Sequence, residues 1–154
     1  MRKMEKRQET IKNLKKLGSK VTEEIRKGEN PSLEVPIRTL SNVKYDPSQR
    51  MITMGAGVAN RYFFNVGTVR KFVQTIEAAA LAKELNEMEK HLSLREAFYM
   101  MKRTLPNSNI NLVDEQEESN EAIEDLELIT GSSREMLHVN ANKLGSVAGK
   151  VTVQ

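Results

Sequence analysis

The sequence contains no cysteine among its 154 residues. A disulfide framework, a thiolate zinc site and a cysteine nucleophile are therefore excluded. No apolar run reaches the length of a membrane span, and the N-terminus does not read as a signal peptide. Internal repeats and low-complexity segments are also absent. These absences predict a soluble, intracellular chain with no membrane contact, forming one domain with an additional N-terminal arm.

Charge is unevenly distributed along the chain, although the net charge is only +3 and the pI is about 9.1. Residues 1–30 contain ten Lys or Arg against five Asp or Glu, whereas residues 104–133 contain eight acidic residues and no Lys or Arg. The basic segment suits a nucleic acid or an acidic partner. The acidic block should not lie on DNA phosphates.

The first 27 residues are charged and favour a helix. Their apolar members fall on a seven-residue pattern: Met4, Ile11, Leu14, Val21 and Ile25. Gly18 and Ser19 interrupt this pattern, which predicts two helices rather than one. The segment can be a solvated arm or a helix that docks on a partner, and the sequence favours neither.

The next part of the chain predicts a small β-hairpin packed on a helical core. Leu33–Arg38 is an extended run, Asp46–Gln49 is a turn, and Arg50–Met54 alternates as a strand does. Arg38 and Arg61 lie near this platform. We expect them to be solvated or salt-bridged, with contact to phosphate as the alternative.

A long helix is predicted from an N-cap at Asn65 to about Met88. A broad apolar stripe assigns it to the core: Val66, Val69, Phe72, Val73, Ile76, Ala79, Ala80 and Leu85. His91 follows in a loop, where a lone histidine is expected to be exposed, with DNA contact as the alternative.

The segment Ser93–Leu105 predicts a second helix. Ser93 and Glu96 form a capping box at its start. One apolar face recurs at helical spacing: Leu94, Phe98, Met101 and Leu105.

Tyr99 lies off that face, roughly 120° from the middle of the apolar stripe. Arg95 precedes it by one turn, and Lys102 and Arg103 follow it by one turn. Nearby positive charge favours a phenolate and would hold a phosphodiester, which suits a nucleophile in phosphoryl transfer. The structural alternative is a core tyrosine with its hydroxyl at the rim.

An asparagine-rich loop, Pro106–Asn111, leads to the acidic block and to a helix from about Ser119 to Ile129. The carboxylates of this helix lack the spacing of a metal cage: Glu121, Glu124, Asp125 and Glu127. We expect them to form a solvated face and not a metal site.

Thr130–Ser133 is a glycine turn of the kind that joins two helices of a helix-turn-helix. A second helix, Arg134 to about His138, and two strands, Val139–Ala141 and Val147–Val153, complete a winged helix. Candidate DNA contacts, mostly to phosphate, are Lys102, Arg103, Ser132, Ser133, Arg134, His138, Asn140, Asn142 and Lys143. For each residue after Thr130, capping or turn formation is an equally good explanation. The predicted fold is mainly α with small β-hairpins (α+β): a helical arm over residues 1–30 and a winged-helix domain over 31–154.

The run LREAFYMMKRTL (Leu94–Leu105) resembles the catalytic-tyrosine motif of the A subunit of type IIB DNA topoisomerases (topoisomerase VI) and of the related proteins that make meiotic DNA breaks. Many members have tyrosine where this chain has Phe98; the second aromatic carries the chemistry, and here it is Tyr99. Four further stretches resemble the family in its own order: Val35–Asp46, Phe63–Ala80, Asp114–Leu128 and Arg134–Val153.

The resemblance implies a nucleophile, Tyr99, with Arg95 assisting, on a winged-helix domain like that of catabolite activator protein. It implies double-stranded DNA as substrate, a homodimer of A subunits, and an ATPase B subunit that binds ATP and lies against the N-terminal region. Mg²⁺ would be held by acidic residues of a following Toprim domain, which should begin where this chain ends. Without that domain, we expect weak DNA binding and no cleavage by this chain.

Two alternatives remain open. One is a non-catalytic winged-helix DNA-binding module or regulator in which Tyr99 is structural. The other is a meiotic-type double-strand-break protein. The expected location is cytoplasmic with the nucleoid, or nuclear in a eukaryote.

Overall fold

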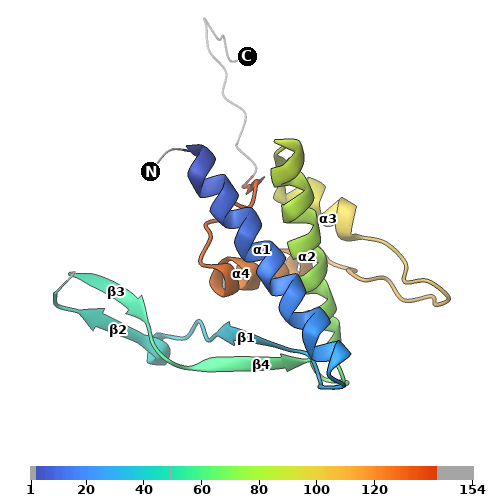
Figure 1. Ribbon diagram of the computed structural model, residues 1–154, viewed down its shortest axis with the longest axis horizontal. Coiled ribbons are helices and arrows are strands. Elements are labelled where there is room, and N and C mark those ends of the chain that lie inside the picture. The colour runs from blue at the N-terminus through green and yellow to red at the C-terminus, as the bar shows by residue number, and fades with distance from the viewer. Residues whose placement is uncertain (1–2, 49, 142–154) are drawn as a thin grey trace, which may run out of the picture.

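The computed structural model describes residues 3–48 and 50–141. Within these ranges the chain forms four α-helices with short two-stranded sheets, which confirms the predicted α+β class. Helices α1 (Lys3–Arg26) and α2 (Val69–Met88) lie side by side and antiparallel, and α4 (Gln116–Thr130) packs against both (Figure 1). No helix in the described ranges is long and apolar enough to cross a membrane.

Helix α1 runs through Gly18 without a break, so the prediction of two helices is wrong. Leu14 and Leu17 are buried in the core that α1 shares with α2. Packing on both sides of Gly18 offsets the cost of about 1 kcal/mol that a glycine adds to a helix interior. The interpretation of this segment as a solvated arm is also wrong, since Leu14 and Leu17 are buried in the core, although Met4 and Ile25 at the two ends of the helix are exposed.

The strands form two ribbons rather than the single predicted hairpin. β2 (Val43–Asp46) and β3 (Met51–Met54) form the hairpin around the turn after Asp46, and it projects away from the helices (Figure 1). β1 (Ser32–Pro36) pairs instead with β4 (Val58–Tyr62), in the register Leu33 opposite Arg61. β1 also contacts α4, so this ribbon is the one that packs on the helical core.

Asn42 joins the two ribbons, at the end of the 3₁₀ turn Leu40–Asn42. Its side-chain amide donates to the carbonyl oxygens of Ile37 and Gly57, and its Oδ1 accepts from the Gly57 N–H at 2.8 Å. A Cβ on Gly55 would lie 2.5 Å from Asn42 Oδ1. Glycine is therefore required at position 55 if the ribbons are to stay joined in this way.

Helix α2 begins at Val69, four residues after the predicted cap. Asn65 Oδ1 accepts from the Gly67 N–H, and the Asn65 carbonyl accepts from Thr68 and Val69. Asn65 thus forms a local turn instead of an N-cap. Val66, expected on the apolar stripe, is 98% exposed. The predicted end at Met88 is confirmed, and Glu89 follows in the left-handed region at φ 57°.

Helix α3 (Leu94–Met101) starts with the predicted capping box. Ser93 Oγ accepts from the Glu96 N–H at 3.2 Å, and the Glu96 carboxylate accepts from the Ser93 N–H at 2.7 Å. The helix ends at Met101, four residues before the predicted end. Leu105 packs against the core from beyond the helix.

Helix α4 begins at Gln116, three residues earlier than predicted. Glu115 caps it, together with Glu118, and Gly131 ends it in the left-handed region at φ 64°. Ile123 and Leu126 of α4 are buried against side chains of the other three helices and of β1.

The predicted helix Arg134–His138 is wrong: residues 134–138 form a hydrogen-bonded turn. The carbonyl of Ser133 accepts from both Met136 and Leu137. β6 (Val139–Asn140) follows and pairs in parallel with β5 (Leu92–Ser93). The second predicted strand of the wing, Val147–Val153, lies outside the described residues, so the winged helix stays a prediction.

Candidate functional site

The tyrosine helix α3 separates a buried face from an exposed one. Ala97 and Met101 are completely buried, and Leu94 and Phe98 pack partly against the core. Tyr99 lies on the other side and is 59% exposed. The capping box fixes the start of the helix and the core holds its inner face, so the helix presents the Tyr99 ring to solvent from a rigid support.

Of the three cations predicted beside Tyr99, Arg95 is the one that lies over the Tyr99 ring. Its guanidinium carbon lies 6.0 Å from the centre of the Tyr99 ring, within the range of a cation–π interaction. The pair is one helical turn apart on α3, which is the spacing at which side chains meet. The result is an exposed phenol and a guanidinium on one helix face.

Lys102 and Arg103 are directed elsewhere. Lys102 Nζ lies 5.2 Å from the centre of the Phe98 ring and donates to the Asp114 carbonyl oxygen at 3.3 Å. Arg103 donates to the Glu77 carboxylate of α2 at 2.6 Å. The sequence prediction of three cations around the tyrosine therefore holds for Arg95 only.

The acidic block is paired with cations of α2. Arg70 donates to Asp114 at 2.7 Å and to Glu118 at 3.0 Å, and Lys71 reaches Glu121 at 2.8 Å. Hydrogen bonds, the strongest from Arg70, hold the pKa of the Asp114 carboxyl below its usual value. Sequence patterns do not single out Arg70, because its partners lie more than forty residues away.

The expectation that α4 carries a solvated acidic face is wrong for Asp125. The Asp125 and Arg61 side chains, only 6% and 15% exposed, form an ion pair between α4 and β4. Burial raises the pKa of Asp125, and the charge of Arg61 opposes that rise. Arg38 pairs with Glu124 at 2.7 Å, which confirms the salt-bridged alternative for both arginines.

The predicted DNA contacts after Thr130 differ in accessibility. Ser132 and His138 are buried, and His138 Nδ1 lies 2.8 Å from the Lys90 carbonyl oxygen. Ser133 is exposed, and Asn140 lies half-buried on β6. Lys143 and Asn142 lie outside the described residues.

Arg134 is half-buried and is held by two carboxylates of α4. Its guanidinium lies 3.1 Å from Glu127 and 3.4 Å from Glu124. A DNA phosphate would have to compete with these pairs for the guanidinium.

His91 is exposed, as predicted, but it does not stand alone. Its ring stacks on that of His138, with centroids 4.0 Å apart and planes 19° from parallel. Its position beside the turn 134–138 is set by the parallel pairing of β5 and β6 rather than by any local sequence signal.

The described residues do not fit the Mg²⁺ that the resemblance implies. In residues 3–48 and 50–141, no three Asp, Glu or His side chains gather closely enough to hold a metal ion. The carboxylates of α4 are instead directed to Arg and Lys side chains. These described residues are therefore given no metal-binding role in the proposed reaction.

Comparison with known proteins shows which family the chain is similar to. Residues 70–139 match the family described as Type IIB DNA topoisomerase. The A subunit of type 2 DNA topoisomerase 6 from Pyrococcus abyssi is 41% identical over 147 residues, covering 96% of this chain and 38% of that protein. The protein of the same name in Methanothermobacter thermautotrophicus is 34% identical over 152 residues, covering 98% of this chain and 42% of its own length. The chain thus spans about two fifths of the length of these relatives.

Proposed function

This chain belongs to the type IIB DNA topoisomerase family, and on that premise we propose that it is the nucleophile-bearing, DNA-binding part of a topoisomerase A subunit. The observation that carries the proposal is the exposed Tyr99 ring beside Arg95 on a capped helix. The matched segment, residues 70–139, contains this pair.

The proposed reaction is a transfer of the DNA backbone to tyrosine. Tyr99 Oη gives up its proton to water and forms a bond to the phosphorus of a phosphodiester. The bond from phosphorus to one deoxyribose oxygen breaks, and that oxygen leaves as a hydroxyl group after taking a proton. The tyrosyl–DNA ester conserves the bond energy, so the reverse attack by the hydroxyl reseals the strand.

Arg95 is the candidate group for binding the phosphate as it reacts. A guanidinium offers two parallel N–H donors to phosphate oxygens and keeps its charge at any physiological pH. Its guanidinium carbon, 6.0 Å from the centre of the Tyr99 ring, supports this role. Stabilising negative charge that develops on the phosphate is the usual protein contribution to phosphoryl transfer.

We propose that the complete enzyme takes its metal and its ATP from elsewhere. Mg²⁺ would be bound by a Toprim domain, and ATP by a B subunit. The names of the relatives, which are A subunits, support a partner subunit in general. Two A subunits, each cutting one strand of double-stranded DNA, would make the double-strand break.

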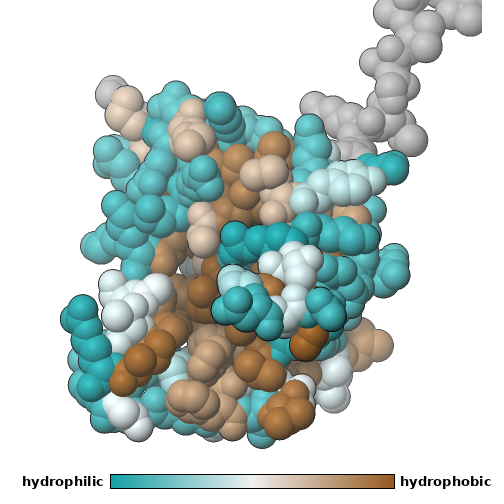
Figure 2. All heavy atoms as spheres, turned by 90° about the vertical axis from the view of Figure 1, so that its right-hand side faces the viewer, coloured by the Kyte–Doolittle hydropathy of each residue, from teal (hydrophilic) through white to brown (hydrophobic). Residues whose placement is uncertain are grey.

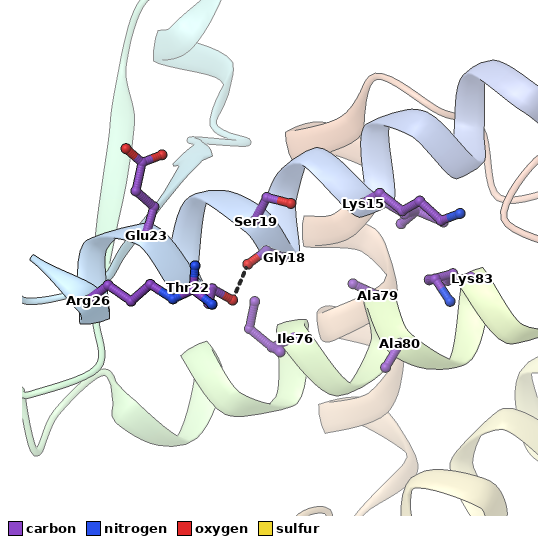
Figure 3. Close-up of a pocket in the computed structure, with 11 residues that line it drawn as sticks. Lys15, Gly18, Ser19, Thr22, Glu23, Arg26, Ile76, Ala79, Ala80 and Lys83 are labelled. Atoms are coloured by element: carbon purple, nitrogen blue, oxygen red, sulfur yellow. Dashed lines mark hydrogen bonds between the residues drawn. The ribbon is translucent and has the colours of Figure 1, made fainter.

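A groove between α1 and α2 is the candidate docking surface for the B subunit. It has a volume of about 750 Å³ and is lined from both helices by small side chains, among them Gly18, Ala79 and Ala80 (Figure 3). Lys15, Arg26 and Lys83 line its rim together with Glu23, and Glu87 pairs with both lysines. Deleting residues 1–28 would not test this contact, because Leu14 and Leu17 belong to the core. Ala80→Glu, at an exposed groove position, tests it without removing core side chains.

The experiment that tests the function is trapping of a covalent protein–DNA adduct. The chain is mixed with supercoiled DNA, Mg²⁺, ATP, and separately supplied Toprim and B-subunit components, and the reaction is stopped with SDS. An adduct that depends on Tyr99 supports the proposal. An adduct that survives Tyr99→Phe contradicts the role of Tyr99. Metal-dependent cleavage by the chain alone contradicts the expected dependence on a Toprim domain.

A second candidate is a non-catalytic DNA-binding module. The observation in its favour is that Lys102 and Arg103, predicted to lie beside Tyr99, are held by Asp114 and Glu77, as a structural role of the tyrosine helix would allow. DNA binding without any adduct, in the complete mixture, would favour it. A meiotic-type break protein shares the covalent step, and breaks that form but do not reseal would distinguish it.

A further inference from the structure

Residues 104–111, here called the 104–111 finger, leave the end of α3 and return to it as a narrow hairpin. The Leu105 N–H donates to the Ile110 carbonyl at 2.8 Å, and the Leu112 N–H donates to the Arg103 carbonyl at 2.9 Å. Thr104 and Asn111 form a β-bridge, and Thr104 Oγ1 donates to Asn111 Oδ1 at 3.0 Å. These bonds stiffen a segment that projects well away from the body of the molecule (Figure 1).

The composition of the finger sets it apart from the rest of the surface. The sequence TLPNSNIN contains no ionisable side chain, although 29% of the chain is charged. Ser108 and Asn111 are used internally, since Ser108 Oγ donates to the Leu105 carbonyl and the Asn111 amide donates to Asp114. Asn107 has φ 57°, which accounts for asparagine there. Asn109 and Ile110 are exposed and have no such structural reason.

The finger starts next to the candidate nucleophile. Its root at Arg103 follows Tyr99 by four residues and the end of α3 by two. Each limb has four residues, so at about 3.3 Å per residue the tip can reach roughly 13 Å from the root. At 3.4 Å per base pair, that reach corresponds to about four base pairs of DNA. The finger projects toward the viewer in Figure 2, where hydrophilic residues lie near the middle of the face and hydrophobic residues gather below them.

Two exposed side chains of the finger, Asn109 in the turn at the tip and Ile110 opposite Leu105 on the returning limb, fit bases better than phosphates. Phosphate is bound by cations. The finger itself carries none, and Arg103 at its root is held by Glu77. An uncharged amide such as Asn109 makes hydrogen bonds to base edges in the grooves, and a single aliphatic side chain such as Ile110 packs on a thymine methyl or between base steps. A protein partner would call for a broader apolar surface than one isoleucine.

We propose that the 104–111 finger reads base pairs adjacent to the phosphodiester that Tyr99 attacks, through Asn109 and Ile110, and so sets the sequence preference of binding and cleavage. The inference rests on the proposed function, because only a DNA-bound Tyr99 brings bases within reach of the finger.

Photo-crosslinking from a single introduced cysteine tests where the finger lies on DNA, since the chain has no cysteine of its own. Asn109→Cys carries a thiol-linked photo-crosslinker in the presence of a defined duplex. Met100→Cys, exposed beside Tyr99, reports whether DNA occupies the catalytic face at all. Glu117→Cys, exposed in the acidic block, is the matched control.

Crosslinks to bases from Asn109→Cys, severalfold above Glu117→Cys and within a few base pairs of the Met100→Cys crosslinks, are expected. Crosslinks from Met100→Cys but not from Asn109→Cys would contradict the proposed contact of the finger with bases and leave the proposed function standing. No crosslink from either position overturns the proposed function itself.

Selection of bound duplexes from a random-sequence pool tests the readout. The full chain and the Asn109→Ala/Ile110→Ala variant are compared, with Thr53→Ala on the distant β2–β3 hairpin as control. One amide–base contact provides about tenfold discrimination at a position, so the preference at one or two positions should weaken by that factor in the double variant. Identical preferences in all three proteins would show that the finger does not read sequence.

Discussion

The guanidinium carbon of Arg95 lies 6.0 Å from the centre of the Tyr99 ring, and the two residues are one turn apart on α3. Lys102 and Arg103, equally close in sequence, are engaged by Asp114 and Glu77. The tyrosine therefore has one cation beside it. Because the cations have different partners, single substitutions can separate the role of Arg95 from those of Lys102 and Arg103.

Tyr99→Phe should abolish the SDS-trapped adduct in the complete mixture, because the variant lacks the oxygen that bonds to phosphorus. The hydroxyl belongs to a side chain that is 59% exposed, so the free energy of unfolding should change by less than about 0.5 kcal/mol. Gel quantification of the adduct and urea denaturation check the two parts. Tyr45→Phe, on the exposed face of the β2–β3 hairpin, is the matched control and should trap DNA normally.

Arg95→Ala should reduce adduct formation at least about a hundredfold, the scale seen when one group that stabilises transition-state charge is removed. Arg95→Lys should recover part of the activity, because it restores charge without the paired donors. Arg103→Ala serves as control, since it removes a cation that is held by Glu77. Equal losses in Arg95→Ala and Arg103→Ala would mean that the cations act only through general attraction for DNA.

Arg61→Ala should lower the free energy of unfolding by about 3–5 kcal/mol, because it leaves the buried Asp125 carboxylate without its partner. Arg38→Ala, whose side chain is 43% exposed, should cost less than about 1 kcal/mol. Adding Asp125→Asn to Arg61→Ala should restore part of the loss. A small effect of Arg61→Ala alone would show that the pair is solvated.

Acid pH should stabilise the Arg61→Ala variant relative to the original chain. Burial raises the pKa of Asp125 above its ordinary 3.8, so the folded protein disfavours the ionised form. The resulting destabilisation of the folded protein begins as the pH rises through 3.8 and is complete above the pKa of Asp125 in the folded protein. Without Arg61 the penalty grows, so the difference in stability between the two proteins should narrow as the pH falls. Urea denaturation at a series of pH values measures it, and a gap that is independent of pH would contradict this account.

Ser93→Ala should destabilise the fold by about 1 kcal/mol, the usual cost of losing an N-cap side chain. The N–H of Ser93, and then its hydroxyl, lower the pKa of Glu96 below the ordinary value of 4.5. The contribution of Glu96 is therefore present above pH 4.5 and is lost as the pH falls through its folded pKa. Glu96→Gln should flatten this part of the pH profile in thermal denaturation. An unchanged profile would mean that the capping box does not persist in solution.

Gly18→Ala should raise the free energy of unfolding by about 0.5–1 kcal/mol, since alanine costs less backbone entropy in a helix. A Cβ at this position meets no atom within 4 Å, so the gain is not offset by a clash. Thermal denaturation checks the sign. The fully formed helix α1 predicts stabilisation, whereas a hinge at Gly18 would predict loss.

Local signals were reliable where both partners lie within one helical turn. Ser93 and Glu96 are three residues apart, and the capping box that they predict forms. The end of α2 at Met88 was also predicted, because the periodic pattern stops there. Asn65 shows the limit of the same reasoning, since its side chain serves a local turn as readily as an N-cap.

Predictions failed where the decisive partner is distant in sequence. Asp125 is buried because Arg61, sixty-four residues earlier, lies against it. Arg103 turns away from Tyr99 because Glu77 on α2 is within reach. Helix α1 continues through Gly18 because α2 covers the leucines before it. The tyrosine itself was recognisable from a short motif, whereas the environment of its cations is a product of tertiary packing.

The parallel pairing of β5 with β6 has a mechanical consequence. Ser93 is both the N-cap of α3 and the partner of Asn140, so β6 is paired directly with the start of the tyrosine helix. α3 is eight residues and therefore about 12 Å long, so a tilt of about 10° at Ser93 would move its far end by roughly 2 Å. A displacement of β6 at Asn140 would therefore tilt α3 and move the Tyr99 phenol by a larger distance than the displacement at Ser93.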